Sequence, residues 1–334
     1  MPYHLHQGGR RRRRRRWPAL VAVLALLGAG VAAGLTLAPD RADEPVRPAA
    51  PAIEEPLAGG GPAPLAGGGT APSPLSVRLD DPRDVVRLRF KRRPRSGLLF
   101  DLDTGRVLWR HDPTRVLPIA SLTKMMTALL VARRVPPGSK VRITREALRY
   151  RGSGVGLFRR GRRVGVETML HGLLLPSGND AAIALAQRTS GSVQRFVALM
   201  NRRAQAMGLA CTHFSSPDGY ANRGTHSCTP DLAALARAVL REPRLARIVR
   251  RRQAVLPFPI KGGRIYLYNH NPLLRQGYRG VTGIKTGYTA AAGRCLVATA
   301  RRGRVRLGVV LLHSPDPGGQ ARKLLERGFR LVGS

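Results

Sequence analysis

The sequence predicts a single folded domain of the mixed α/β (α+β) class, in which a sheet built from both ends of the domain is covered by helices. Three observations support this. Apolar runs broken by turn residues occur near residue 100 and again after residue 280. Between them, apolar residues recur at helical spacing, and strands at both ends with helices between are typical of such a fold. A chain of 334 residues with 43% apolar content can bury a sizeable core.

The N-terminal segment is predicted to be an export element. Residues 1–16 end in an unbroken run of arginines, and residues 17–38 carry no charge. A helix of that length crosses a hydrocarbon core of about 30 Å, so 17–38 is predicted to be a transmembrane anchor or a signal segment. The arginines would keep 1–16 as a cytoplasmic tail and place the rest of the chain at the extracytoplasmic face of the cell membrane. An anchor is favoured over a cleaved signal because the apolar run is long, although small residues at 31–33 and 36–38 permit cleavage.

Residues 39–81 are predicted to be a linker, because they are rich in Pro, Gly and Ala and contain the near-repeat PLAGGG. The folded domain is then expected at 82–334. Its first element is a hairpin at 98–110, where two apolar runs flank Asp103-Thr104-Gly105. Its last strands are expected at residues 281–289, 295–300 and 305–312.

The middle of the domain is predicted to be helical. From Leu122 onward, apolar residues recur at spacings of three and four, which indicates a helix. Gly208 is expected to end one helix, and Thr229 to cap the start of another. Further helices are expected at residues 166–175, 180–188, 192–207, 230–241 and 319–332.

The formal charge of +39 points to an anionic partner or to an arginine-rich solvated surface. Nucleic acid is not favoured as a partner, since zinc-ligand spacing, basic-leucine heptads and aromatic RNA-binding motifs are missing from the sequence. A solvated surface is the favoured interpretation, with attraction to phospholipid, cell-wall polymer or acidic substrate as the alternative. No cofactor or metal site is predicted, because the eight histidines include no His-x-x-x-His pair.

The three cysteines define no disulfide framework, because their number is odd and no Cys-x-x-Cys spacing occurs. Cys211 and Cys228 could pair outside the cytoplasm. Two small buried thiols are the favoured interpretation.

Ser121 and Lys124 are the first candidate catalytic residues. Only six residues of the chain are lysines, and Lys124 follows Ser121 at a spacing that shares one helix face. A serine hydroxyl becomes a good nucleophile when a nearby base takes its proton. Lysine can be that base when its pKa is lowered, whereas arginine stays protonated. Position 124 is therefore hypothesised to need a cation that can lose its proton.

A second motif, SGND, lies at a predicted break between two helices, where polar side chains can project into a cleft. Ser177 could relay a proton there, and Asn179 could hold a substrate amide. An ordinary loop with a helix cap would have the same pattern. The motif therefore supports a catalytic site only in combination with the other two motifs.

A third motif, IKTGYT, lies on a predicted strand. Lys285 and Thr286 can bind a substrate carboxylate, and Gly287 lets an extended substrate approach the strand edge. The N–H of Tyr288 could join that of Ser121 as an oxyanion hole.

The motifs S-x-x-K, S-x-N and K-T-G, in this order, resemble the active-site set of penicillin-binding proteins and serine β-lactamases. Their context, including ASLTKMMTALL, LLLPSGNDAAIALA and GIKTGYTAAAGRCLVATA, is similar to the D-alanyl-D-alanine carboxypeptidases, the low-molecular-mass penicillin-binding proteins. The resemblance covers about Gly97 to Val332 and implies a five-stranded antiparallel sheet flanked by helices, in a single catalytic domain. The segment RGSGVGLF, 151–158, is unusually glycine-rich.

The resemblance implies a serine-type carboxypeptidase that removes the terminal D-Ala from peptidoglycan stem peptides. Ser121 would attack the carbonyl of the D-Ala-D-Ala bond, Lys124 would accept its proton, and Ser177 would help move that proton to the leaving amine. Asn179 would bind the substrate backbone, and the residues at 285–286 would bind its terminal carboxylate. Water would then hydrolyse the acyl-enzyme, and penicillins would acylate the same serine as substrate mimics.

Other functions remain open from sequence. An endopeptidase that cuts D-alanyl cross-links would use the same residues, and a catalytically silent wall-binding module would use the basic charge. A β-lactamase is not favoured, because no Glu-x-x-Leu-Asn pattern lies between Asn179 and Lys285.

Overall fold

The computed structural model describes residues 74–81, 84–220 and 224–332, which all belong to one compact unit. The basic tail, the anchor or signal segment and most of the linker that the sequence predicts lie outside the described residues. Within the described ranges, no helix combines the length and the apolar content that a bilayer crossing requires.

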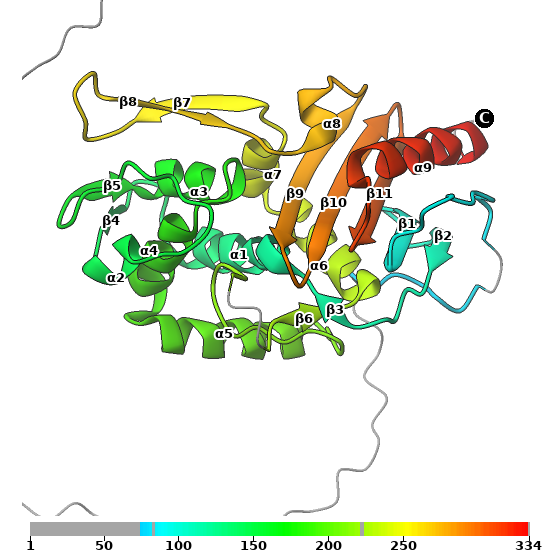
Figure 1. Cartoon of the computed structure of the whole chain (residues 1–334), viewed down its shortest axis with the longest axis horizontal. Coiled ribbons are helices and arrows are strands. Elements are labelled where there is room, and N and C mark those ends of the chain that lie inside the picture. The colour runs from blue at the N-terminus through cyan, green and yellow to red at the C-terminus, as the bar shows by residue number, and fades with distance from the viewer. Residues whose placement is uncertain (1–73, 82–83, 221–223, 333–334) are drawn as a thin grey trace, which may run out of the picture. The chain divides into compact units, whose positions relative to one another are not determined.

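A five-stranded antiparallel sheet lies at the centre of the fold, and both ends of the domain contribute to it (Figure 1). Its strand order is β2-β1-β11-β10-β9. The bounds are β1 Ser96–Asp101, β2 Val107–His111, β9 Val281–Thr289, β10 Gly293–Arg302 and β11 Val305–Leu312. In the β1–β11 pair, Leu98 lies opposite Val310 and Leu99 opposite Val309. The predicted α+β class and the five-stranded sheet are confirmed.

The remaining elements lie between β2 and β9 or after β11. The helices are the 3-10 turn η1 Ala120–Thr123, α1 Lys124–Arg134, α2 Arg145–Leu148, α3 Val166–Leu174, α4 Asn179–Ser190, α5 Val193–Ala206, α6 Thr229–Arg241, α7 Pro243–Val249, α8 Pro272–Arg275 and α9 Pro317–Val332. Three short antiparallel pairs are β3 Leu117–Pro118 with β6 His226–Ser227, β4 Lys140–Arg142 with β5 Arg163–Gly165, and β7 Gln253–Pro257 with β8 Arg264–Tyr268.

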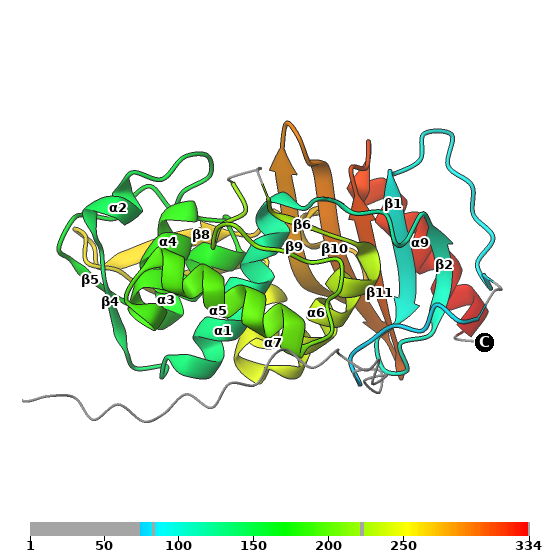
Figure 2. The same ribbon diagram turned by 90° about the horizontal axis from the view of Figure 1, so that it is seen from below.

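Side chains alternate along the strands and give the sheet two apolar faces. On one face Leu99 and Val309 pack with α9 in a core of their own. On the other face Leu98 and Val310 join a larger core that includes α1, α3, α4 and α6. Figure 2 shows α9 on the far side of the sheet from α6. The turn η1, which leads into α1, lies against the edge strand β9.

The five helices expected over bounded ranges are confirmed to within two residues at each end. Thr229 is not a cap, however. The helix α6 begins at Thr229, Cys228 is the N-cap residue, and the Thr229 hydroxyl donates to the carbonyl oxygen of Pro113 at 3.0 Å. Thr229 is therefore the first residue of the helix and does not occupy the cap position.

The expectation of two free thiols at Cys211 and Cys228 is wrong, because these residues form a disulfide. The strand β6 and the start of α6 bring Cys228 next to the segment that holds Cys211, a proximity that sequence spacing does not reveal. Cys295 is a buried free thiol.

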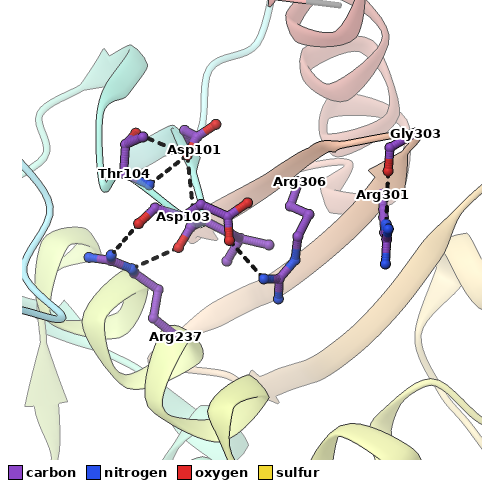
Figure 3. A network of polar contacts seen from close by, with 8 residues as sticks. Asp101, Asp103, Thr104, Arg237, Arg301, Gly303 and Arg306 are labelled. Atoms are coloured by element: carbon purple, nitrogen blue, oxygen red, sulfur yellow. Dashed lines mark hydrogen bonds and ion pairs between the residues drawn. The ribbon is translucent and has the colours of Figure 1, made fainter.

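A short stretch before the expected boundary at residue 82 packs on the domain. Leu75, Val77 and Leu79 contact the larger core. Arg237 in α6 is buried and donates to the carbonyl oxygens of Ser76, Leu102 and Asp103. Figure 3 shows its guanidinium reaching the turn between β1 and β2, where Arg306 also pairs with the Asp103 carboxylate. One arginine therefore joins the incoming chain to the first hairpin.

Candidate active site

Ser121 and Lys124 lie together where η1 meets α1. Ser121 is in the 3-10 turn and α1 begins at Lys124. Side chains at i and i+3 eclipse in a 3-10 helix, and Lys124 Nζ donates to Ser121 Oγ at 2.8 Å. The structure thus brings the pair together. Ser121 lies in the turn just before the α-helix, and Lys124 is the first residue of the helix.

Lys124 Nζ is buried and has three acceptors. It donates to Ser121 Oγ, to Asn179 Oδ1 at 2.6 Å and to the carbonyl oxygen of Asp218 at 2.8 Å. Burial lowers the pKa of Lys124 to about 8, and the charges of Asp218 and Asp180 oppose this. A neutral amine keeps two N–H donors and gains one lone pair. Since amide and carbonyl oxygens can only accept, the lone pair is left for the Ser121 hydroxyl.

The carbonyl of Asp218 comes from a segment that sequence reasoning missed, SSPDGY at 215–220. Gly219 has a φ of +74°, and a Cβ there would lie 2.0 Å from the carbonyl oxygen of Ala120. Only glycine permits this approach, which holds the segment against the turn that carries Ser121. A backbone carbonyl leaves no signature in a sequence, and the Asp-Gly turn is the one trace of this contact.

Ser177 and Asn179 lie at the break before α4. Ser177 has a φ of +68°, in a region that non-glycine residues rarely adopt, and its buried Oγ has no hydrogen-bond partner among the described residues. The side chain of Asn179 is engaged at both ends. Its Oδ1 accepts from Lys124, and its Nδ2 donates to the carbonyl oxygen of Arg151 at 2.5 Å. Ser177 therefore keeps a free hydroxyl, whereas Asn179 orients the lysine.

Asp180 fastens the glycine-rich segment 151–158 to the same motif. Its buried carboxylate accepts from the N–H groups of Val155 and Gly156, both at 2.9 Å, and from that of Ala181. Burial raises the pKa of this carboxyl, and the backbone hydrogen bonds oppose the rise. The sequence places Asp180 only at the start of a helix, so its hold on the segment is a structural finding.

Lys285 lies on the opposite wall, in β9. It is buried, and Nζ donates to the carbonyl oxygen of Thr286 at 2.8 Å. Burial lowers the pKa of Lys285 well below 10.5, and the positive charge of Lys124 lowers it further. The two lysines of the motifs therefore influence each other electrostatically across the site.

The strand β9 passes directly against the turn that carries Ser121. A Cβ at Gly287 would lie 2.9 Å from the carbonyl oxygen of Ile119 and 3.2 Å from the Ser121 nitrogen. Both are backbone atoms, so they cannot move aside as a side chain would. Thr286 and Tyr288 alternate away from Gly287, and Tyr288 is 68% exposed.

A cavity of about 520 Å³ lies between the two walls. The predicted residues that line it are Ser121, Ser177, Thr286, Gly287 and Tyr288. The other three lie buried behind this lining: Lys124, Asn179 and Lys285. Sequence reasoning missed several lining residues, including Ser153, His270, Arg275, Arg294 and Asp316. Of these, Arg294 lies directly across from Tyr288 in the β9–β10 pair, so a correct strand register identifies it.

In the described part of the chain, one group of side chains has possible metal-ligand atoms that lie close together. The ligand atoms of Cys211, Cys228 and Asp231 lie within 4.8 Å of one another. The two sulfurs are bonded to each other, and Asp231 accepts from the Cys211 N–H and the Thr212 hydroxyl. These ligand atoms are thus already engaged within the protein.

Known proteins are similar to this chain in sequence and in fold. The family model for D-alanyl-D-alanine carboxypeptidase, peptidase S11, matches residues 89–316. The chain is 34% identical to the D-alanyl-D-alanine carboxypeptidase DacF of Bacillus subtilis, over 70% of this chain and 62% of that protein. It is also 34% identical to DacB2 of Mycobacterium tuberculosis, over 70% of this chain and 81% of that protein. The chain thus spans less than two thirds of the length of DacF.

Solved structures are similar over the same part of the chain. A mutant of the Streptomyces K15 DD-transpeptidase has a TM-score of 0.68 and 29% identity, and the match covers 72% of this chain and 100% of that one. The D-alanyl-D-alanine carboxypeptidase from Mycobacterium tuberculosis H37Rv has a TM-score of 0.68 and 32% identity, with 73% and 94% covered.

Proposed function

The chain belongs to the D-alanyl-D-alanine carboxypeptidase family, peptidase S11, and we propose that it acts as a serine-type carboxypeptidase that removes the terminal D-Ala from peptidoglycan stem peptides. One observation carries the proposal. Lys124 is a buried amine with a lowered pKa, and of its three partners only the Ser121 hydroxyl can donate a proton to it. This arrangement activates a serine nucleophile without histidine.

In the proposed reaction, Lys124 Nζ takes the Ser121 proton as Oγ attacks the carbonyl carbon of the D-Ala-D-Ala bond. The developing oxyanion would be bound by the N–H groups of Ser121 and Tyr288. The C–N bond then breaks, the proton passes to the leaving amine with the help of Ser177, and D-Ala departs. Water, with its proton taken by Lys124, hydrolyses the ester and restores the free serine.

The strand wall would fix the substrate. Lys285 and Thr286 are proposed to bind the terminal carboxylate, and Gly287 lets the peptide approach β9 closely. Asn179 is proposed to bind the substrate backbone; its Nδ2 would exchange the Arg151 carbonyl for the substrate carbonyl. Penicillins, which carry a carboxylate next to a strained amide, would acylate Ser121 in the same way.

The proposed place of action is the extracytoplasmic face of the cell membrane, with residues 17–38 as the anchor. The Cys211–Cys228 disulfide supports export, since disulfides persist outside the reducing cytoplasm. Peptidoglycan is a substrate of that compartment.

Intact mass of the full chain after incubation with penicillin tests the proposal, together with D-Ala release from a peptide that ends in D-Ala-D-Ala. We expect a single adduct on the wild type and none on Ser121→Ala, with D-Ala release only by the wild type. The matched control is Ser153→Ala, which alters another serine of the same cavity and should keep the adduct. An unmodified wild type that also leaves the peptide intact would exclude this function.

A further inference from the structure

A second cavity, about 570 Å³ in volume, opens beside the candidate active site and is called the arginine pocket here. It is lined by Arg92, Arg93, Arg95, Tyr288, Gly293, Arg294, His313, Ser314 and Pro315. No acidic residue is among them. Within the described part of the chain, none of the four arginines makes an ion pair. Four cations thus surround one cavity without a counter-charge from the described protein.

The backbone that carries these arginines is fixed. The Arg95 N–H donates to the carbonyl oxygen of Leu312, and Gln320 Nε2 donates to the carbonyl oxygen of Arg92 at 2.6 Å. The Ser314 N–H donates to the carbonyl oxygen of Arg294 at 2.8 Å. The three segments that form the pocket lie before β1, where β9 turns into β10, and after β11, and they are therefore held to one another and to α9. The cationic groups meet because the fold brings these segments together.

The pocket continues the candidate active site. Tyr288 and Arg294 line both cavities, and they are direct partners across β9 and β10. The only acid that lines the active-site cavity is Asp316, which accepts from the Gly319 N–H and does not line the pocket.

The order of residues along β9 gives the substrate a direction. The carboxylate-binding residue Thr286 comes first, then Gly287 beside Ser121, and then Tyr288 at the border of the pocket. A peptide extended along β9, with its terminal carboxylate at Thr286 and its reacting carbonyl at Ser121, continues past Tyr288. Each residue of such a peptide advances about 3.3 Å, so the next residues on the acyl side reach the arginines.

We propose that the arginine pocket binds a carboxylate on the acyl side of the peptide substrate, the side that stays on Ser121 after D-Ala leaves. The inference rests on the proposed function and adds a substrate preference to it. Guanidinium groups suit this ligand because their planar N–H pairs match the two oxygens of a carboxylate.

The test uses two peptides that end in D-Ala-D-Ala and differ upstream only by glutamate or glutamine. The pocket variant of the full chain is Arg92→Gln with Arg93→Gln and Arg95→Gln. The control variant is Arg188→Gln with Arg195→Gln and Arg202→Gln, which removes the same charge from exposed positions on α4 and α5. We expect the wild type and the control to prefer the glutamate peptide roughly tenfold in kcat/KM, and the pocket variant to lose that preference.

Benzylpenicillin acylation separates the two proposals, because this reagent carries no carboxylate on its acyl side. The wild type and both variants should acylate at the same rate. Failure of the wild type to acylate would overturn the proposed function, whereas normal acylation with equal cleavage of the two peptides would overturn the pocket alone. Inorganic phosphate should compete with the glutamate peptide in the wild type and in the control variant, but not in the pocket variant. Phosphate binding without any preference between the peptides would assign the pocket to a phosphate ligand and also overturn the proposal.

Discussion

Lys124 and Lys285 are both buried on opposite walls of one cleft, yet their surroundings differ. Lys124 donates three hydrogen bonds and lies near the charges of Asp218 and Asp180, and its pKa is about 8. Lys285 donates one hydrogen bond to a neighbouring carbonyl. Its pKa is lowered by burial and by the positive charge of Lys124. Nearby carboxylates favour the protonated form of Lys124, whereas among the described residues no anion does the same for Lys285.

The difference separates two tasks that one residue type can serve. A base must exchange its proton near working pH, which the partners of Lys124 make possible. A binding cation needs an anion to complete its surroundings, and the substrate carboxylate would supply it at Lys285. The two lysines therefore respond differently to substitution, to pH and to ligand.

The largest effect is expected for Lys124→Arg. Arginine keeps the charge but cannot accept the serine proton, so acylation by penicillin should slow by roughly 10²- to 10⁴-fold. Time-resolved intact mass measures the rate, and circular dichroism checks that the variant is folded. A folded variant that acylates at the wild-type rate would show that Lys124 is not the base.

A smaller effect is expected for Lys285→Gln. Loss of the cation removes a charged hydrogen bond to the terminal carboxylate, so kcat/KM for a D-Ala-D-Ala peptide should fall roughly 10- to 100-fold. The same peptide with an amidated C-terminus is the control, because wild type and variant should cleave it equally slowly. An equal loss on both peptides would assign Lys285 to a role other than carboxylate binding.

The pH dependence follows from Lys124. In the proposed mechanism acylation requires the neutral form of Lys124, whose pKa is about 8, so the rate should rise with pH, roughly tenfold for each unit below 8, and level off above it. Acylation rates with benzylpenicillin, measured from about pH 5.5 to about pH 9 in steps of roughly one pH unit, test this. A flat profile would mean that Lys124 does not change its proton in this range.

The smallest effect concerns proton uptake. A bound carboxylate opposes both causes that lower the pKa of Lys285, so binding should raise that pKa and take up less than about one proton per site. Calorimetry of Ser121→Ala with a D-Ala-D-Ala peptide, in two buffers of different ionisation enthalpy, measures the uptake. Adding Lys285→Gln should abolish it, and an unchanged uptake would assign the proton to another group.

Sequence reasoning was most successful where a local pattern determines structure. The strands at 281–289 and 305–312 are confirmed to the residue, because their apolar and β-branched content agrees with their pairing. The hairpin of β7 and β8 was missed, since prolines at 257 and 259 argue against a strand. In the structure Pro257 lies at the end of β7, where its missing N–H does least harm.

In the site, too, the sequence predicts local features but not contacts between distant segments. The three motifs identify side chains that lie on both walls of the cleft, but they contain no information on the Asp218 carbonyl, on the Asp180 contact with the glycine-rich segment, or on the disulfide. Each of these joins segments far apart in the chain, and two depend on backbone atoms that every residue possesses. The arginine pocket likewise arises from three segments, none of which is distinctive in a chain so rich in arginine.

The contact of Arg237 with Ser76 has a mechanical consequence. Together with Leu75, Val77 and Leu79, which contact the larger core, this guanidinium attaches the incoming chain beside the β1–β2 turn. That hairpin forms one edge of the sheet, while β9 forms the other, with β11 and β10 between them. A pull on the incoming chain would therefore be resisted first at the edge of the sheet opposite the strand beside Ser121.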